Sequence, residues 1–351
     1  MTKQEKINAF NPNGVGIKNG NFIGLPFDEN DAEVVLMPIP WDATVSYSAG
    51  TATGAQNILD ASSQLDLFDH DVKDAWKMGI YMRELNQDWL KKSKKTRKIA
   101  EKYIDFLENG GKIEDNAEMQ QNLSKVNDAC DELRQWVYEE TKTLLNQGKL
   151  VGLVGGDHST PLGYMQALAE RYDNFGIVHF DAHLDLRNAY EGFTYSHASI
   201  FYNALKLPQV SRLTSIGIRD YCEEEVELVE KSQGRVQVFY DSYVKKQMYK
   251  GNSLYSIYMN LIDMLPKNVY ISFDIDVLTP HLCPNTGTPV PGGMEFQEAM
   301  FLIKCILDSK RKIIGFDLSE TAGVGNEWDG NVAARVLYKL ANVMGKSNSP
   351  T

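Results

Sequence analysis

The chain has 351 residues, 43% of them hydrophobic, which is enough for one large α/β domain or two small ones. Its formal net charge of −11 argues against a nucleic-acid-binding surface. The chain has neither an apolar stretch of membrane-spanning length (~18 residues) nor a signal-peptide core, and its four cysteines lie far apart, so a cytoplasmic protein is expected.

The first third of the chain contains two predicted strands. Residues 1–32 are polar, rich in Asn and Gly and without a clear hydrophobic period, which predicts an N-terminal arm or an edge element. The apolar run AEVVLMPIP at 32–40 predicts a buried parallel strand. A turn with several glycines then leads into a short helix ending near Ser62, and MGIYMREL at 78–85 predicts a second strand.

A helical insertion is predicted at about 86–147, with helices at about 87–107 and 123–147. The second helix carries an apolar stripe at helical spacing, which is typical of core packing. A basic run lies in the first helix: Lys91, Lys92, Lys94, Lys95, Arg97 and Lys98. This run is predicted to be a solvent-exposed helix face rather than a phosphate-binding patch.

From residue 150 onward, strand and helix patterns alternate. The predicted strands are LVGLV, FGIVHF, RLTSIGI, RVQVFY, NVYISF and KIIGF. Such alternation predicts a parallel sheet with helices on both faces. Because no repeat, linker or low-complexity segment divides the sequence, residues 1–351 are predicted to form a single three-layer α/β/α domain with a mostly parallel central sheet.

Four polar motifs follow predicted strands: GGDHS (155–159), DAHLD (181–185), SFDIDVL (272–278) and FDLSE (316–320). Ligands of open α/β sheets gather at the carboxyl ends of the strands, where all four motifs fall. Each motif alone is compatible with a helix cap, a turn or a core histidine. Their joint occurrence favours one functional site.

The motifs contain the candidate metal ligands His158, Asp181, His183, Asp185, Asp274 and Asp276. Within DAHLD and DID these side chains recur every second residue, which places them on one side of an extended chain. Carboxylates aimed at one point repel each other unless cations lie between them. One imidazole per ion with oxygen ligands suits Mn²⁺, or else Ni²⁺, Co²⁺ or Zn²⁺. A two-metal hydrolytic site is therefore predicted. A serine hydrolase is disfavoured because the G-x-S-x-G elbow is missing.

In order, spacing and content, these motifs resemble the arginase/agmatinase/formimidoylglutamase ureohydrolases, which are binuclear manganese enzymes. The resemblance extends from about Pro38 to Ala341. It implies that one metal is held by His158, Asp181, Asp185 and Asp274. It implies that the second is held by Asp181, His183, Asp274 and Asp276, so that Asp181 and Asp274 bridge the two ions.

The resemblance also implies three catalytic roles. Glu320 in FDLSE receives the guanidinium of the substrate. Asp185 carries a proton to the departing nitrogen, and His197 in YSHAS exchanges protons with solvent. The implied products are urea with an amine or with ammonia, and the family implies a homo-oligomer, a trimer or a hexamer. For His179, a supporting or core role is favoured over a ligand role.

The substrate is predicted from the loop at 185–199, DLRNAYEGFTYSHAS. It resembles agmatinases more than arginases, because the polar set that holds the amino-acid end of arginine is not recognisable. Trp41, the 86–147 insertion and QLDLFD (64–69) resemble the branch that includes nickel-dependent guanidine hydrolases. Free guanidine needs a closed pocket, and Trp41, Phe193 and Tyr195 are candidates to close it, with core packing or a subunit interface as the alternative role. An agmatine-like substrate is therefore expected first and free guanidine second, with Mn or Ni. Lower alternatives are a formimidoylglutamase, a non-catalytic paralogue and a zinc amide hydrolase of the deacetylase type.

Overall fold

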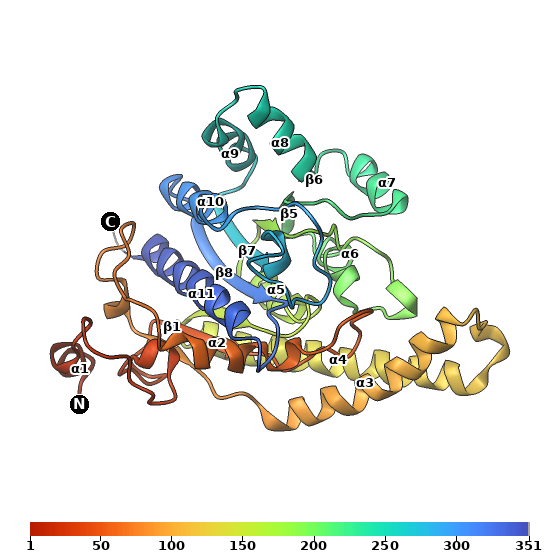
Figure 1. The fold of residues 1–351 in the computed structure, drawn as a ribbon, viewed down its shortest axis with the longest axis horizontal. Helices are drawn as coiled ribbons and strands as arrows, with labels where there is room; N and C mark the ends of the chain where they lie inside the picture. Colours follow the sequence, from red (N-terminus) through yellow and green to blue (C-terminus); the bar gives the residue numbers. More distant parts are fainter. Residues whose placement is uncertain (350–351) are drawn as a thin grey trace.

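A computed structural model describes residues 1–349 of the chain and contains one eight-stranded sheet. Figure 1 shows the sheet with the helices around it. The strands are β1 (Val34–Pro38), β2 (Ile80–Met82), β3 (Leu150–Val154), β4 (Phe175–Phe180), β5 (Val210–Ile216), β6 (Val236–Phe239), β7 (Asn268–Asp274) and β8 (Lys312–Ser319). Their order is β2-β1-β3-β8-β7-β4-β5-β6, and every neighbouring pair is parallel. The predicted parallel α/β architecture is confirmed.

Helices cover both faces of this sheet (Figure 1). Their bounds are α1 (Lys3–Ala9), α2 (Gly54–Ser62), α3 (Gln87–Glu108), α4 (Ala117–Asn146), α5 (Leu162–Arg171), α6 (Ile200–Ala204), α7 (Glu223–Lys231), α8 (Asp241–Tyr249), α9 (Leu254–Asp263), α10 (Phe296–Asp308) and α11 (Glu327–Asn348). In residues 1–349, no helix combines the length and apolar character needed to cross a lipid bilayer.

Two hydrophobic clusters separate the three layers, and alternate strand residues enter one or the other. On β7, Ile271 and Phe273 pack with α2, α9, α10 and α11, whereas Tyr270 points to the opposite cluster with α3, α4, α5 and α6. Val34 and Val35 of β1 divide in the same way. Because both faces are buried, these strands are continuously apolar in sequence.

The structure corrects several predicted boundaries. The strand predicted at 78–85 is only three residues long. The second insertion helix begins at Ala117 rather than near 123, because the side chain of Asn116 caps it by accepting from the Met119 amide at 3.1 Å. Within the predicted arm, the chain forms the short helix α1, started by a capping box between Thr2 and Glu5.

Only the first part of the predicted arm is exposed. Residues 1–20 are mostly exposed, whereas Phe22, Leu25 and Phe27 are buried in the same hydrophobic cluster as α2 and α11. The side-chain amide of Asn21 donates to the carbonyl of Ile80 at 3.2 Å. Residues 21–27 therefore belong to the core beside β2, and not to a detached arm.

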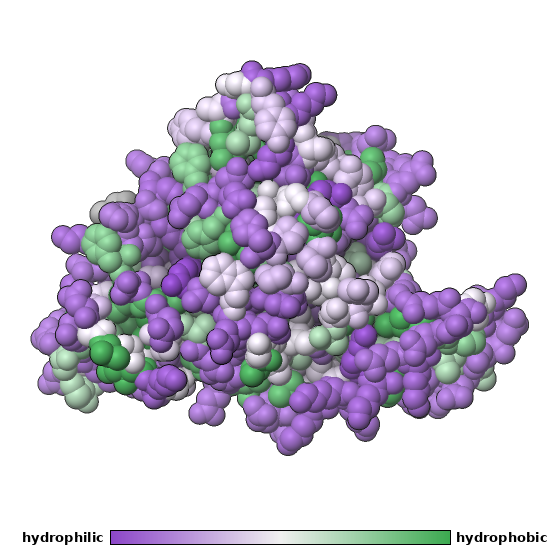
Figure 2. Space-filling model, in the orientation of Figure 1, coloured by the Kyte–Doolittle hydropathy of each residue, from purple (hydrophilic) through white to green (hydrophobic). Residues whose placement is uncertain are grey.

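Helices α3 and α4 form a long hairpin whose far end projects beyond the rest of the molecule (Figure 1). The projecting end is mainly hydrophilic in Figure 2. In the basic run of α3, four side chains are exposed, which are Lys91, Lys94, Lys95 and Lys98. At the base of the hairpin, the ring centroid of Trp89 lies 6.0 Å from that of Trp41 and 5.2 Å from that of Trp136. The hairpin is thus anchored by aromatic packing next to β1.

Gly152 in the middle of β3 permits close contact with β8, and its substitution is expected to destabilise the fold. A Cβ at this position would lie 2.2 Å from the ring of Phe316, the residue it pairs with. We expect Gly152→Ala to lower the free energy of unfolding by about 1–3 kcal/mol, as overpacking of a core does. Denaturant titration measures this. In a double mutant with Phe316→Leu the loss is expected to shrink; unchanged stability of Gly152→Ala would contradict the expectation.

Candidate metal centre and substrate pocket

The sheet order brings the four motifs together. Strands β3, β8, β7 and β4 are consecutive neighbours, and the motifs stand at their carboxyl ends. After β3 the chain turns through Gly155 and Gly156, both with positive φ (80° and 74°). A Cβ on Gly156 would lie 2.6 Å from the carbonyl oxygen of Ile39, so only glycine fits this turn into the site.

A first cluster surrounds His158. Its Nδ1 lies 2.9 Å from Oδ2 of Asp181, 3.1 Å from Oδ2 of Asp185 and 3.3 Å from Oδ2 of Asp274. All four side chains are buried. The structure therefore brings together all the residues predicted for the first metal.

A second cluster lies next to it around His183. Nδ1 of His183 lies 3.1 Å from Oδ2 of Asp276 and 3.4 Å from Oδ1 of Asp181. Asp181 thus belongs to both clusters. Asp274 meets the second cluster through its other oxygen, Oδ1, which accepts from the backbone amide of Asp276 at 2.9 Å.

The buried carboxylates of this centre have shifted pKa values, partly because their charges lie close together. Burial, reinforced by the charges of Asp276 and Asp181, raises the pKa of Asp274 well above its usual range. Burial and the charge of Asp181 raise the pKa of Asp185 to about 7. Burial also acts to raise the pKa of Asp181, but His179 and His158 outweigh it and hold that pKa well below the usual range. Buried oxygen and imidazole donors that repel one another suit a pair of divalent cations.

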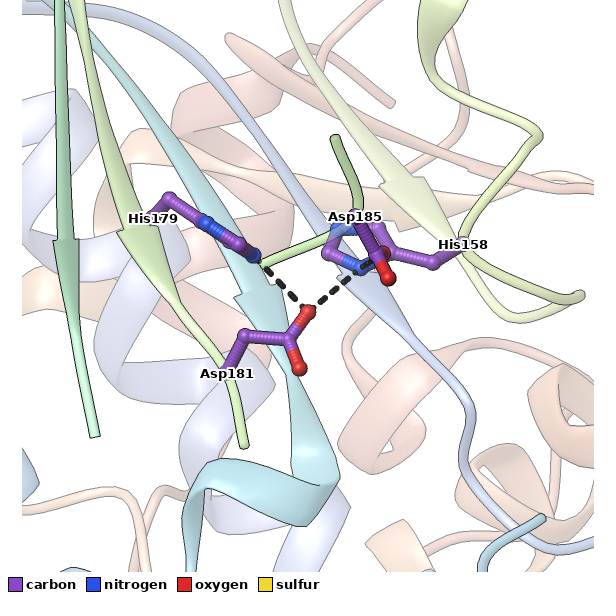
Figure 3. A group of neighbouring side chains, drawn as sticks. All are labelled: His158, His179, Asp181 and Asp185. Carbon is purple, nitrogen blue, oxygen red and sulfur yellow. Dashed lines mark hydrogen bonds and ion pairs between the residues drawn. The ribbon is translucent and has the colours of Figure 1, made fainter. Parts of the chain in front are cut away.

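His179 supports the centre from behind. Its Nε2 lies 2.8 Å from Oδ2 of Asp181, and its Nδ1 lies 3.0 Å from Oγ of Ser215. Figure 3 shows that His179 and His158 approach the same carboxylate oxygen of Asp181 from two sides. Because both of its ring nitrogens already have partners, His179 suits an orienting role better than a ligand role.

A buried hydrogen-bond chain behind His158 was not predicted. Nε2 of His158 lies 2.9 Å from Oγ of Ser272, which donates to Oδ1 of Asp317 at 2.7 Å. Oδ2 of Asp317 accepts from Oγ of Ser319 at 3.0 Å. This chain fixes the orientation of the imidazole, so that Nδ1 faces the carboxylates. The period of two from Ser272 to Asp274 places both side chains on the same side of β7, but it does not reveal the contact with His158, 114 positions away in the sequence.

Glu320 follows β8 and presents a free oxygen. Oε1 accepts from the backbone amide of His158 at 2.9 Å, while Oε2 is buried without a hydrogen-bond partner among residues 1–349. Burial, together with the charge of Asp157, raises the pKa of Glu320 well above its usual range. The backbone of Glu320 is left-handed, with φ 60°. A buried carboxylate with one unsatisfied oxygen is suited to a cationic hydrogen-bond donor.

A pocket of about 170 Å³ opens onto the centre, with His183 and Asp185 in its wall. His197 lines it too, and the Nδ1 of His197 has no hydrogen-bond partner within the described part of the chain. Burial, with the nearby His183, lowers the pKa of His197 to about 4. The loops contribute Arg187, Tyr190, Asp220 and Tyr221 to its outer wall.

The aromatic residues proposed to close the pocket lie elsewhere. Trp41 and Phe193 are completely buried in the hydrophobic cluster of α3 and α4, and Tyr195 packs against the same cluster. The aromatic side chains that line the pocket are Tyr190 and Tyr221. Sequence alone did not separate the two groups, since all five lie in loops after strands.

An all-parallel α/β sheet with a cluster of histidines and aspartates at its carboxyl edge has the features of a metal-dependent hydrolase. Comparison with known families gives the particular group: the Arginase family model matches residues 32–341, and the chain belongs to this family. The chain is 29% identical to an N(1)-aminopropylagmatine ureohydrolase of Thermus thermophilus, covering 91% of this chain and 92% of that protein. It is 27% identical to the agmatinase of Bacillus anthracis, with coverages of 90% and 92%.

Solved structures show the same fold. The proclavaminate amidino hydrolase of Streptomyces clavuligerus aligns with a TM-score of 0.72, covering 96% of this chain and 100% of that chain at 20% sequence identity. The eight-stranded parallel sheet is thus the arginase-like α/β fold.

Proposed function

We propose that the protein is a binuclear metal-dependent ureohydrolase that cleaves a C–N bond of a small guanidino compound to urea and an amine, with an agmatine-like compound as its substrate. The observation that carries the proposal is the double cluster sharing Asp181, beside the unpaired buried oxygen of Glu320. The family and the names of the relatives, agmatinase and aminopropylagmatine ureohydrolase, support it.

In this proposal one metal is held by His158, Asp181, Asp185 and Asp274, and the other by Asp181, His183, Asp274 and Asp276. The chain's nitrogen and oxygen donors favour Mn²⁺, with Ni²⁺ as the alternative. When bound, the two cations would lower the pKa of water enough to make it a nucleophile at neutral pH. The histidine and aspartate side chains alone do not supply this chemistry.

The protein's own groups bind and orient the substrate. Oε2 of Glu320 accepts hydrogen bonds from the guanidinium and fixes the position of its carbon. Asp185, at the inner wall of the pocket, delivers a proton to the departing nitrogen, which must leave as a neutral amine. His197, whose Nδ1 in the pocket wall has no partner among residues 1–349, transfers protons between the pocket and solvent.

The outer pocket distinguishes the candidate substrates. The exposed carboxylate of Asp220 lines it and offers a partner for the terminal ammonium of an agmatine-like arm. The alternative substrate, free guanidine, is favoured by the small volume of about 170 Å³. A comparison of urea release from both compounds decides between them.

Arginine is expected to be a poor substrate. Its carboxylate and α-amino group need dedicated polar partners, and burying these charges unpaired costs several kcal/mol. We expect kcat/KM for arginine to be more than about tenfold below that for the best of agmatine and guanidine. Urea release under the same metal loading measures this. Arginine turnover within tenfold of the best substrate would overturn the prediction.

Further properties are proposed on composition and on the family resemblance. The acidic composition argues against a nucleic-acid partner, and the four unpaired cysteines support a cytoplasmic location. We propose a homo-oligomer, a trimer or hexamer, on the family resemblance. A non-catalytic paralogue or a zinc amide hydrolase would release no urea, which separates both from the proposal.

A further inference from the structure

The α3–α4 hairpin contacts two of the loops that line the pocket, although it carries none of the proposed catalytic groups. One loop, residues 187–199, supplies Arg187, Tyr190 and His197 to the pocket wall. The other loop, residues 41–53, supplies Ser46. Figure 1 shows the hairpin running along one side of the molecule, with its base next to the sheet.

Asn127 of α4 holds the first loop by two hydrogen bonds. Its Nδ2 donates to the carbonyl oxygen of Gly192 at 3.1 Å, and its Oδ1 accepts from the amide of Thr194 at 2.9 Å. The two bonds fix the backbone on both sides of Phe193. The ring of Phe193 packs against that of Tyr103 in α3, with centroids 5.4 Å apart. Asn127 of α4 and Tyr103 of α3 thus hold the same three residues of the loop, 192–194.

This loop needs external support because its backbone is strained. Ala189 and Glu191 both adopt left-handed conformations, with φ of 52° and 54°. Non-glycine residues adopt such conformations only where the surroundings hold them. His197 lies five residues beyond Gly192, so the clamp at Asn127 lies close to the group that lines the pocket.

The second loop is held in a similar way by α3. Oγ of the buried Ser93 accepts from the amide of Asp42 at 3.1 Å and donates to its Oδ1 at 3.0 Å. Oδ2 of Asp42 accepts from the amide of Gly50 at 2.8 Å. Arg97 also donates to the carbonyl of Val45. Two of the loops that line the pocket are therefore held by the hairpin, whereas Asp220, Tyr221 and Thr288 come from other segments.

We propose that the α3–α4 hairpin is a brace for the active-site loops and that Asn127 is a positioning residue, acting on the reaction through His197 and the pocket wall. The proposal rests on the ureohydrolase function proposed above and gives a role to the helical insertion. It predicts that loss of the Asn127 contacts loosens the 187–199 loop. The metal content is expected to be kept, because only Asp185 of the six proposed ligands adjoins this loop. The ligands His158, Asp274 and Asp276 lie on other segments.

The test compares Asn127→Ala with Asn122→Ala, a matched control on the same helix. The amide of Asn122 contacts Sδ of Met119 at 3.8 Å, within α4, and makes no hydrogen bond to the loop in the described part of the chain. For Asn127→Ala we expect faster hydrogen–deuterium exchange in 187–199, unchanged metal content, and a fall in kcat/KM of about 10- to 100-fold with a lower kcat, since small misplacements of active-site groups cost this much. Asn122→Ala is expected to match the wild type in all three.

Wild-type exchange and kcat/KM in Asn127→Ala, or equal losses in both variants, would overturn the proposal. If Asn127→Ala does not fold, the isosteric Asn127→Asp decides by the same measurements, because it keeps an acceptor for the Thr194 amide but has no donor for Gly192. If the wild type releases no urea from any guanidino compound, the proposed function fails, while exchange in 187–199 still decides whether Asn127 holds the loop.

Discussion

Asp274→Asn is expected to lose most of its bound metal and nearly all activity, about a thousandfold or more, while keeping its fold. The substitution removes a negative charge proposed to be shared by two cations, and the amide is a much weaker ligand. Elemental analysis of the purified variant and urea release measure the two effects.

Asp60→Asn is the matched control for this variant. Asp60 is exposed at the surface of α2, so the same chemical change there is expected to leave metal content and turnover unchanged. Two ions per chain still bound in Asp274→Asn would reject its assignment as a bridging ligand.

Glu320→Gln is expected to keep its metal. Its kcat/KM is expected to fall about 10²- to 10³-fold, which corresponds to a loss of several kcal/mol in transition-state binding. The amide retains the shape of the side chain and an acceptor for the His158 amide. It lacks the charge that is proposed to pair with the guanidinium of the substrate. Steady-state kinetics together with metal analysis separates this role from that of a ligand.

The control for Glu320→Gln is Glu327→Gln, at the exposed first turn of α11 in the same part of the chain. It is expected to behave as the wild type. Near-normal turnover of Glu320→Gln with full metal content would remove Glu320 from the proposed substrate contact.

Much of the fold was predictable because both faces of the sheet are buried. Strands such as Val34–Pro38 and Phe175–Phe180 are apolar at almost every position, a pattern typical of central parallel strands. The order of the strands was not predictable, since it depends on how helices pack across the sheet. The short β2 and the burial of Phe22 depend on contacts between distant segments in the same way.

The candidate ligands were predictable because each is local to a strand end. The motifs directly follow β4 and β7, and the sheet order brings them together. The extended geometry expected from their period of two is not found, since Asp276 lies in the 3-10 turn Ile275–Val277 and Asp185 has φ 54°. Contacts between residues that are far apart in the sequence leave no such local pattern. Asn127 meets Gly192 across 65 sequence positions, and His158 meets Ser272 across 114, so neither partner is visible from local spacing.

The most direct test of the central claim uses the wild-type enzyme, loaded separately with Mn²⁺ and with Ni²⁺. Urea release is measured from agmatine, guanidine, guanidinobutyrate and arginine, and formamide release from formimidoylglutamate. The proposal predicts two ions per chain and equal amounts of urea and amine from agmatine, or of urea and ammonia from guanidine. Full metal loading with no urea from any of these compounds would contradict it.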